Sequence, residues 1–283
     1  MPGETGTRVA GDAEVDRIAA LATRCRLVLL DMICRAGSGH AGSSLSCVDI
    51  ISVLKFDQMR CPAGSLASDR DVFVLSKGHA APAWYAALIV GGDLPASEIG
   101  TLRAIDSRLQ GHPDRTRLDL VDVSSGALGQ GLSMALGRAR GKRLKGQDSA
   151  VYCLLGDGEC QEGQVWEALL HAGAHRVSNL VAIIDYNNSQ SDGELDSILP
   201  LRPLPDKLAA FGWQVQEVNG HSHGDLREAV RAARWDTTRP SVIIAHTRKG
   251  WLGGGRTLLG GSHSAVPSAA EYAQAVAFLG AAP

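Results

Sequence analysis

The chain has 283 residues, 45% hydrophobic and 5% aromatic, with a formal net charge of −2, which allows a sizeable core but excludes a dedicated nucleic-acid binder. No stretch approaches the roughly 18 consecutive apolar residues that span a bilayer, and residues 1–16 lack the apolar segment of a secretion signal. Six cysteines in no CxxC pair indicate reduced intracellular thiols, so we expect a soluble, cytoplasmic protein.

The predicted elements alternate between helices and short apolar strands. Apolar residues at helical spacing predict an amphipathic helix over residues 15–33, which Gly37 ends, and a second helix over residues 48–56. A strand over residues 71–75 then runs into Ser76-Lys77-Gly78-His79. The later predicted strands cover residues 150–155, 180–184, 213–218 and 241–246, and the helices between them cover residues 129–145, 164–174 and 226–234.

This alternation predicts an α/β fold, with a parallel sheet covered by helices on both faces. Ligands of such sheets bind outside the carboxyl ends of the strands, where this chain places its glycine-rich loops. Residues 250–261 (GWLGGGRTLLGG) predict the one long flexible loop. Because no internal repeat or low-complexity linker interrupts the chain, we expect a single domain over residues 1–283.

The loop after the strand at residues 150–155 combines glycines with acids in Gly156-Asp157-Gly158-Glu159. Its glycines let backbone amides approach a phosphate, whereas a bare Asp157 carboxylate would repel one. A divalent cation resolves this conflict, because Mg²⁺ takes oxygens from one or two carboxylates and from a bound diphosphate. The next strand ends in Asp185-Tyr186-Asn187-Asn188, which can bring an amide oxygen to the same place. A tight turn and a cap would explain either motif alone, but one strand–helix–strand unit separates them, and this spacing favours a diphosphate site.

The pair of motifs resembles the diphosphate-binding signature of thiamine diphosphate enzymes, and an ordered set of motifs narrows the resemblance to the transketolase family. The resemblance extends over residues 13–267. Each motif is weak alone, but their order is specific. The set consists of Ser38-Gly39-His40, Ser76-Lys77-Gly78-His79, Gly111-His112-Pro113, Gly126-Ala127-Leu128-Gly129-Gln130-Gly131, and Gly156-Asp157-Gly158 through Glu162-Gly163.

The resemblance implies a thiamine diphosphate-binding fold with a bound Mg²⁺ or Ca²⁺. The implied metal ligands are Asp157, Asn187 and the main-chain carbonyl of Ser189. Gly126 would offer its carbonyl to the cofactor's aminopyrimidine, and Leu128 would press on the rings. The full set of implied cofactor-binding residues is His79, Gly126, Leu128, Gly156, Asp157, Gly158, Glu159, Asn187 and His263.

The resemblance also implies catalytic roles for four histidines that approach the diphosphate and the substrate hydroxyls: His40, His79, His112 and His263. Imidazole suits this work because it can donate to an anion and exchange protons near neutral pH. Glu162 and Glu167 begin the helix after the diphosphate turn. Similar acids in the family couple active sites across the subunit interface, although the helix dipole alone also favours acids there.

A full transketolase has further domains, which supply the aminopyrimidine pocket and the glutamate that protonates its ring, and the resemblance ends before them. It therefore implies the diphosphate-binding subunit of a split transketolase. A separate partner chain would carry the pyrimidine-binding and C-terminal domains, most simply in an assembly with two copies of each chain. The enzyme would transfer a two-carbon ketol unit from a ketose or ketose phosphate to an aldehyde or a specialised acceptor. Ala41 and Ala127 stand where the family usually has proline, which leaves the donor and acceptor open.

Two other functions remain alternatives. A relative that decarboxylates a 2-keto acid, such as a deoxyxylulose-phosphate synthase or the α half of a dehydrogenase component, would use a similar diphosphate site. The ordered SGH, SKGH and LGQG motifs favour ketol transfer over this reaction. A non-catalytic interaction subunit could keep the fold, but it would have no need of Asp157, Asn187 and the histidines.

Polar residues outside these motifs are interpreted as surface features. His171 and His175 share a helix face but lack the glutamate of the zinc-protease motif. His221 and His223 follow an Asn-Gly turn and receive the same interpretation. A basic run at a helix carboxyl end is interpreted as a solvated face: Arg138, Arg140, Lys142, Arg143 and Lys145.

Overall fold

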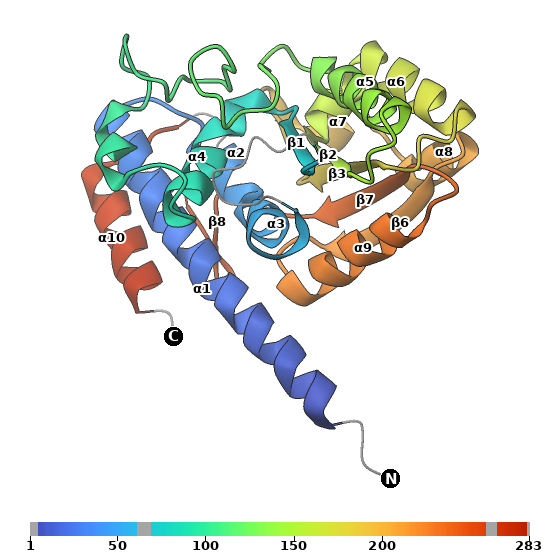
Figure 1. The fold of residues 1–283 in the computed structure, drawn as a ribbon. Helices are drawn as coiled ribbons and strands as arrows, with labels where there is room; N and C mark the ends of the chain where they lie inside the picture. The colour runs from blue at the N-terminus through green and yellow to red at the C-terminus, as the bar shows by residue number, and fades with distance from the viewer. Residues whose placement is uncertain (1–4, 61–68, 259–264, 282–283) are drawn as a thin grey trace.

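The centre of the molecule is a five-stranded parallel sheet in the order β1-β2-β3-β7-β6 (Figure 1). The structure is a computed structural model and describes residues 5–60, 69–258 and 265–281. The strands are β1 (Val72–Leu75), β2 (Val151–Gly156), β3 (Leu180–Tyr186), β6 (Gln214–Asn219) and β7 (Ser241–His246). The predicted parallel α/β sheet is confirmed, and every predicted strand is present at or close to its predicted bounds.

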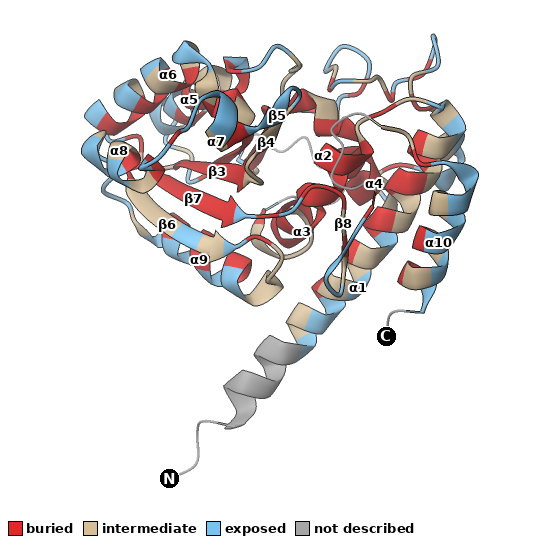
Figure 2. Ribbon diagram, turned by 180° about the vertical axis from the view of Figure 1, so that it is seen from behind, coloured by how far each residue is buried: buried red, intermediate tan, exposed pale blue. Residues whose placement is uncertain are grey.

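The central strands β3 and β7 are buried along most of their length (Figure 2). Alternate residues of the central strands enter two separate apolar cores, one on each face of the sheet. Tyr152 and Leu154 of β2 belong to one core, whereas Val151, Cys153 and Leu155 belong to the other. Because side chains alternate across a strand, a strand buried on both faces needs apolar residues at every position. This requirement explains the continuous apolar runs in the sequence.

Helices cover both faces of the sheet, as predicted. The first core includes residues of α1 (Thr5–Ala36), α2 (Ala41–Ser46), α3 (Val48–Val53), α4 (Ala81–Val90), α9 (His223–Trp235) and α10 (Ala269–Gly280). The second core includes residues of α5 (Gln130–Leu144), α6 (Gly163–Ala174) and α8 (Leu204–Ala210), and it also takes Leu195 of the short helix α7 (Leu195–Ile198). None of the described helices is both long and apolar enough to cross a membrane.

The structure contains helices that the sequence patterns did not predict. α2, α4, α8 and α10 were absent from the prediction, and α3 continues as a π-helix over Leu54–Gln58. α4 is apolar on nearly all sides, so it shows no helical periodicity. Apart from Leu45, α2 consists of small residues, and the whole helix is buried. Neither helix carries the one-sided pattern on which the prediction depended.

Residues 250–258 form a hairpin and not the loop that the glycines predicted. β8 (Trp251–Gly253) pairs with β9 (Arg256–Thr257). The Gly250 N–H donates to the Gly42 carbonyl at 2.9 Å, and the Arg26 Nε donates to the Trp251 carbonyl at 3.1 Å. The glycines in this segment serve the turn, where Gly253, Gly254 and Gly255 all have positive φ. Residues 259–261 of the predicted loop lie outside the described residues.

The carboxyl ends of all five strands lie along one edge of the sheet, because the strands are parallel. β1 leads there into Lys77, β2 into Asp157 and β3 into Asn187, while β7 leads into Thr247. A second short hairpin, β4 (Ser189–Gln190) with β5 (Gly193–Glu194), follows β3 at this edge. The sheet therefore brings residues from distant parts of the chain to one place.

Candidate functional site

A cavity of about 210 Å³ opens at the carboxyl edge of the sheet. It lies where the loops after β1, β2 and β3 meet residues from the start of the chain and from the loop after β7. Eight residues predicted from the sequence line it: His79, Leu128, Gly156, Asp157, Gly158, Glu159, Asn187 and Ser189. The predicted diphosphate motifs are therefore brought together in one cavity.

Asp157 is held between the ends of β2 and β3. Its carboxylate is 1% exposed, and it accepts hydrogen bonds from the backbone N–H of Gly158 at 2.9 Å and of Asn187 at 2.9 Å. The Asn188 N–H donates to the same carboxylate at 2.5 Å. Burial and the nearby Asp185 carboxylate raise the pKa of Asp157 to about 6. The charged form is thus oriented by three amides but short of positive charge, which is the setting that a cation would stabilise.

Asn187 supplies a second oxygen next to this carboxylate. Its Nδ2 lies 3.5 Å from the Asp185 carbonyl and 3.5 Å from Asp185 Oδ2, so the amide nitrogen is directed at acceptors. Its Oδ1 is buried and has no hydrogen-bond partner within the described part of the chain. A buried acceptor without a partner costs about 1–3 kcal/mol, which a cation at this oxygen would remove. The Asp157 carboxylate and the Asn187 amide oxygen are the kinds of oxygen donor that Mg²⁺ or Ca²⁺ takes, and Ser189 lines the same cavity.

A buried ion pair lies next to the cavity. Lys77 is 2% exposed, and its Nζ donates to Asp185 and, at 3.1 Å, to the Ser43 carbonyl. Burial opposes the charge of Lys77, but the Asp185 carboxylate outweighs burial and raises the pKa of Lys77. Asp185 also accepts from Ser46 Oγ at 2.6 Å and from the Thr247 hydroxyl. The pair therefore ties α2 to the ends of β1, β3 and β7.

Lys249 places a second amine in the lining of the cavity. It is 6% exposed, and its Nζ lies 3.5 Å from the Gln190 carbonyl. Burial, with the charge of Lys77 beside it, lowers the pKa of Lys249 to about 8. Neither lysine was predicted from the sequence as a site residue, although Lys77 stands inside the SKGH motif. Two amines close to an otherwise acidic cavity suit an anionic ligand such as a diphosphate.

Glu159 holds two of the predicted loops together. Its carboxylate is 2% exposed and accepts from Ser76 Oγ at 2.5 Å, from the Gly129 N–H at 2.9 Å and from the Gly156 N–H at 3.1 Å. Burial raises its pKa. All of these contacts go to the protein's own groups, so the described geometry favours a positioning role over direct contact with a cofactor.

Three of the four predicted histidines form one cluster. The ring centre of His40 lies 5.2 Å from that of His79 and 6.5 Å from that of His112. Gly126 lies against the His112 ring, where a Cβ would approach within 3.1 Å, and its φ of 153° also favours glycine. Burial and then Arg103 lower the pKa of both His40, to about 4, and His112. Both imidazoles are therefore neutral at pH 7. His263, the fourth predicted histidine, lies outside the described residues.

Arg103 is a site residue that the sequence analysis missed. Its Nη1 donates to Ser38 Oγ at 2.7 Å, and its guanidinium packs on Gly111, where a Cβ would lie 3.0 Å from Nε. Arg103 therefore joins the loop before His40 to the loop before His112. Its own φ is 63°, a conformation that non-glycine residues rarely adopt. No local sequence signal predicts this contact, because the two loops come together only in the fold.

The surface interpretation of His221 and His223 is wrong. His221 Nδ1 and His223 Nε2 each lie 2.9 Å from the buried Asp49 carboxylate, which also accepts from Arg26 Nη2 at 2.6 Å. The Arg248 N–H donates to His221 Nε2 at 2.9 Å, and the His221 ring stacks on Trp251. The two histidines therefore hold the structure together around a buried charge. The surface interpretation of His175 is confirmed, since this side chain is exposed.

Comparisons with known proteins agree with this geometry. A family model described as the thiamine diphosphate-binding domain of transketolase matches residues 18–283. The chain is 41% identical over 226 residues to the 6-deoxy-6-sulfo-D-fructose transketolase subunit SqwG of a Clostridium species, covering 80% of this chain and 82% of that subunit. It is 34% identical over 264 residues to one subunit of the apulose-4-phosphate transketolase of Phocaeicola vulgatus, covering 93% and 94% of the two chains.

Longer proteins match over part of their length. The transketolase of Mus musculus is 43% identical over 236 residues, which are 81% of this chain and 36% of that protein. The crystal structure of transketolase from Campylobacter jejuni superposes with a TM-score of 0.85 at 31% identity, covering 93% of this chain and 42% of that one. The chain thus spans most of the two subunits but less than half of these longer proteins.

Proposed function

Because this chain belongs to the transketolase family, we propose that it is the thiamine diphosphate-binding subunit of a split transketolase. The complete enzyme transfers a two-carbon ketol unit from a ketose or ketose phosphate to an aldehyde acceptor. The observation that carries the proposal is one cavity in which a buried Asp157 and an unpartnered Asn187 oxygen meet two lysines beside three neighbouring histidines. A simple structural turn would leave both the oxygen and the charges unexplained.

The residues around the cavity divide between metal and cofactor. Asp157, Asn187 and the Ser189 carbonyl would hold Mg²⁺ or Ca²⁺, and the metal would bridge to the diphosphate. Lys249 would add positive charge and His79 a ring N–H donor for the same anion, since the Gly158 N–H already donates to Asp157. Gly126 and Leu128 would contact the cofactor rings. Thiamine diphosphate, when bound, supplies the electron sink for carbon–carbon bond cleavage.

The histidine cluster would act on the substrate. His40 and His112 are neutral at pH 7, so each can donate one hydrogen bond and accept another. Such imidazoles can orient the hydroxyls of a sugar and take or return a proton at a hydroxyl oxygen. We assign His112 to the hydroxyl next to the donor carbonyl and His40 to the departing oxygen, with His263 in a related role.

A partner subunit belongs to this proposal. The two relatives that this chain covers over 82% and 94% of their length are named as subunits, whereas the longer transketolases extend well beyond the matched region. We propose that a second polypeptide supplies the aminopyrimidine pocket and the further domains, in an assembly with two copies of each chain. Glu162 and Glu167 would lie at the contact between the two copies of this chain.

The deciding experiment is product analysis on the complex purified from its own cells with thiamine diphosphate and Mg²⁺. We expect a two-carbon unit to move from a ketose donor to an aldehyde. Release of CO₂ from pyruvate, without ketol transfer, would favour the decarboxylating alternative. If a cofactor-loaded complex transforms neither donor, the chain is a non-catalytic subunit. The isolated chain should bind the cofactor but turn over poorly.

A further inference from the structure

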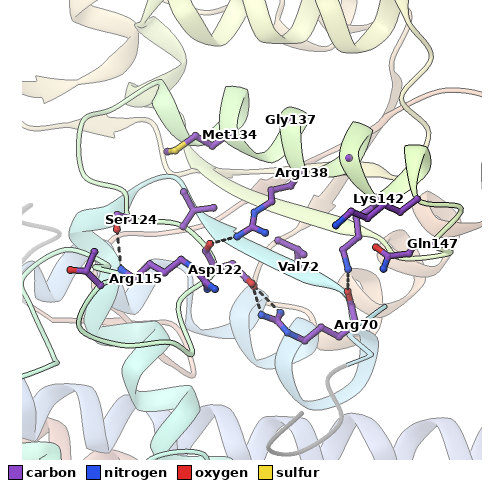
Figure 3. Close-up of a pocket in the computed structure, with 14 residues that line it drawn as sticks. Arg70, Val72, Arg115, Asp122, Ser124, Met134, Gly137, Arg138, Lys142 and Gln147 are labelled. Atoms are coloured by element: carbon purple, nitrogen blue, oxygen red, sulfur yellow. Dashed lines mark hydrogen bonds and ion pairs between the residues drawn. The ribbon is translucent and has the colours of Figure 1, made fainter. Parts of the chain in front are cut away.

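A larger groove, separate from the candidate site, runs along one side of α5 (Figure 3). It has a volume of about 1060 Å³ and lies between α5 and the loop formed by residues 115–124. It shares no lining residue with the cavity at the carboxyl edge. We call it the α5 groove. Its charged lining residues are Arg70, Arg115, Arg138, Lys142, Lys145 and Asp122.

Asp122, the one acidic side chain among the described residues that line the α5 groove, is already neutralised. Asp122 pairs with Arg70, whose Nη1 lies 3.0 Å from Oδ2 and whose Nη2 lies 2.5 Å from Oδ1. Asp122 Oδ2 also accepts from the backbone N–H of Phe73 at 3.0 Å. β1 is an edge strand of the sheet, so this carboxylate also satisfies a buried backbone N–H that no neighbouring strand pairs. Asp122 therefore does not balance the other bases.

Two of the other bases, Arg138 and Arg115, contact neutral oxygens. Arg138 Nη2 donates to the Asp122 carbonyl at 2.7 Å, and Arg115 Nη1 donates to the Val121 carbonyl at 2.9 Å. A carbonyl dipole orients a guanidinium but does not cancel its charge. Burial and then the charge of Arg70 lower the pKa of Lys142, which is consistent with crowded positive charge. The α5 groove is thus a strongly positive surface on a chain whose net charge is −2.

The arrangement of these bases favours an extended ligand. Arg138, Lys142 and Lys145 are spaced four and three residues apart, so they lie along one face of α5 over a length of about 10 Å. Figure 3 shows Arg115 at the other end of the groove. A single phosphate needs donors that converge on one point, whereas these bases follow a line. Several carboxylates along an extended peptide match such a line.

The uncharged lining distinguishes a peptide from a nucleic acid. Val72, Val123 and Met134 provide apolar contacts between the bases. No aromatic side chain is among the described residues that line the groove, so it offers no stacking platform for bases. Acidic side chains alternating with apolar ones would satisfy both parts of this lining.

We propose that the α5 groove is a docking surface for an acidic, extended segment of the partner subunit. The inference rests on the proposed function, because it names the surface through which that partner binds. Docking would also affect the candidate functional site, because α5 begins directly after the loop that carries Gly126 and Leu128. A segment held along α5 would fix this loop next to the cofactor cavity.

Charge reversal tests the proposal. The variants are Arg138→Glu, Lys145→Glu and the pair of them, and the matched control is Arg231→Glu on α9, 57% exposed and outside the groove. The second chain that co-purifies with the tagged protein is immobilised, and its affinity for each variant is measured by bio-layer interferometry. We expect the double variant to bind about tenfold or more weakly at low salt, with little change for the control. We expect Lys145→Glu to fold normally, because the Lys145 side chain is exposed and makes no hydrogen bond within the described residues. Weaker binding by this variant would therefore not be due to misfolding.

Zero-length carbodiimide cross-linking gives an independent result, because it joins a lysine amine only to a touching carboxylate. We expect Lys142 or Lys145 to be joined to an aspartate or glutamate of the second chain, while Lys207 on α8 stays unlinked. If the second chain binds all variants equally and leaves the groove lysines unlinked, the docking surface is overturned although the split transketolase stands. If no second chain co-purifies with a cofactor-binding protein, both proposals are overturned. Loss of phosphate binding alone in the variants would overturn the docking surface and assign the groove to a small anion.

Discussion

Among the site residues, Asp157 is unusual because its surroundings fix the orientation of the carboxylate but do not stabilise its negative charge. Three backbone amides orient it, whereas burial and Asp185 raise its pKa to about 6. A bound cation would reverse that balance. We therefore expect Mg²⁺ together with thiamine diphosphate to raise the melting temperature of the wild-type chain, since a ligand at one hundred times its Kd adds about 2.7 kcal/mol of stability.

Asp157→Asn should abolish this Mg²⁺-dependent shift, because an amide keeps the shape of the side chain but not its charge. Differential scanning calorimetry with and without Mg²⁺ measures the effect. Asp192→Asn, in the exposed turn between β4 and β5, is the control. An undiminished shift in Asp157→Asn would remove the basis of the metal assignment.

A second prediction about single residues concerns Arg103, whose charge affects the pKa values of the neighbouring histidines. After burial, the charge of Arg103 is the largest cause that lowers the pKa of His40, to about 4, and of His112. A histidine whose folded pKa is depressed stays neutral in the fold while the unfolded chain already binds a proton, so protonation favours the unfolded chain below the ordinary histidine pKa. Stability should thus fall as the pH drops from about 6.5 toward 4.

Arg103→Met should raise the pKa of both histidines and weaken this loss of stability in acid. NMR titration of the histidine ring protons measures the shift on the isolated chain, without any assay of activity. Arg108→Met is the control, because Arg108 belongs to the same loop but pairs with Glu98. Unchanged histidine pKa values in Arg103→Met would show that burial alone keeps the rings neutral.

At the scale of elements, the sequence predicted what depends on local pattern. Apolar runs that end at glycine or polar residues predicted all five strands of the main sheet, helical spacing predicted the greater part of α1, and the helical stretches between the strands predicted most of α5, α6 and α9. α4 was not predicted, because it is apolar on nearly all sides. The hairpin after Gly250 was not predicted, because the residues that hold it, Gly42 and Arg26, are more than 200 residues away in the sequence. Contacts between residues so far apart cannot be recognised from a short stretch of sequence.

The same reason explains which site residues could be predicted from the sequence and which could not. Asp157 and Asn187 were predictable because each follows a strand, and parallel strands bring their ends together. The partners of Arg103 and of His221 were not, because the residues that they contact belong to other elements of the fold. The family resemblance located His40, His79 and His112, but their mutual distances come from the structure alone.

Close packing of elements gives a sharp test of the fold. Gly173 of α6 touches the chain before β6, where an added Cβ would lie 1.8 Å from the Phe211 carbonyl oxygen. Gly173→Ala must displace this contact, so we expect it to cost about 1–3 kcal/mol of unfolding free energy or more. Gly137 of α5 has open space around its Cα, so Gly137→Ala should gain up to about 1 kcal/mol through helix propensity.

Urea unfolding of both variants measures the difference. The comparison is matched, since each change adds one methyl group inside a helix. Equal stability of the two variants would contradict the described approach of α6 to Phe211.

At the scale of the whole molecule, one buried carboxylate joins parts of the chain that lie far apart in sequence. Asp49 of α3, 2% exposed, contacts Arg26 of α1 and also His221 and His223 near the start of α9. Arg26 in turn holds the Trp251 carbonyl of β8. Burial opposes the charge of Asp49, but Arg26 and the two histidines outweigh burial and hold its pKa well below the usual range.

Removal of Asp49 should therefore destabilise the whole chain and not one corner of it. Asp49→Asn leaves Arg26 buried without its counter-charge, and breaking such a pair costs about 3–5 kcal/mol. Because a depressed carboxyl pKa adds stability that is lost as the pH falls through it, the wild-type advantage should shrink in acid. The double variant Arg26→Met with Asp49→Asn should recover part of the loss, since no unpaired charge remains. Denaturant unfolding of the single and double variants completes the cycle, and additive losses would mean that the two side chains stabilise the fold independently.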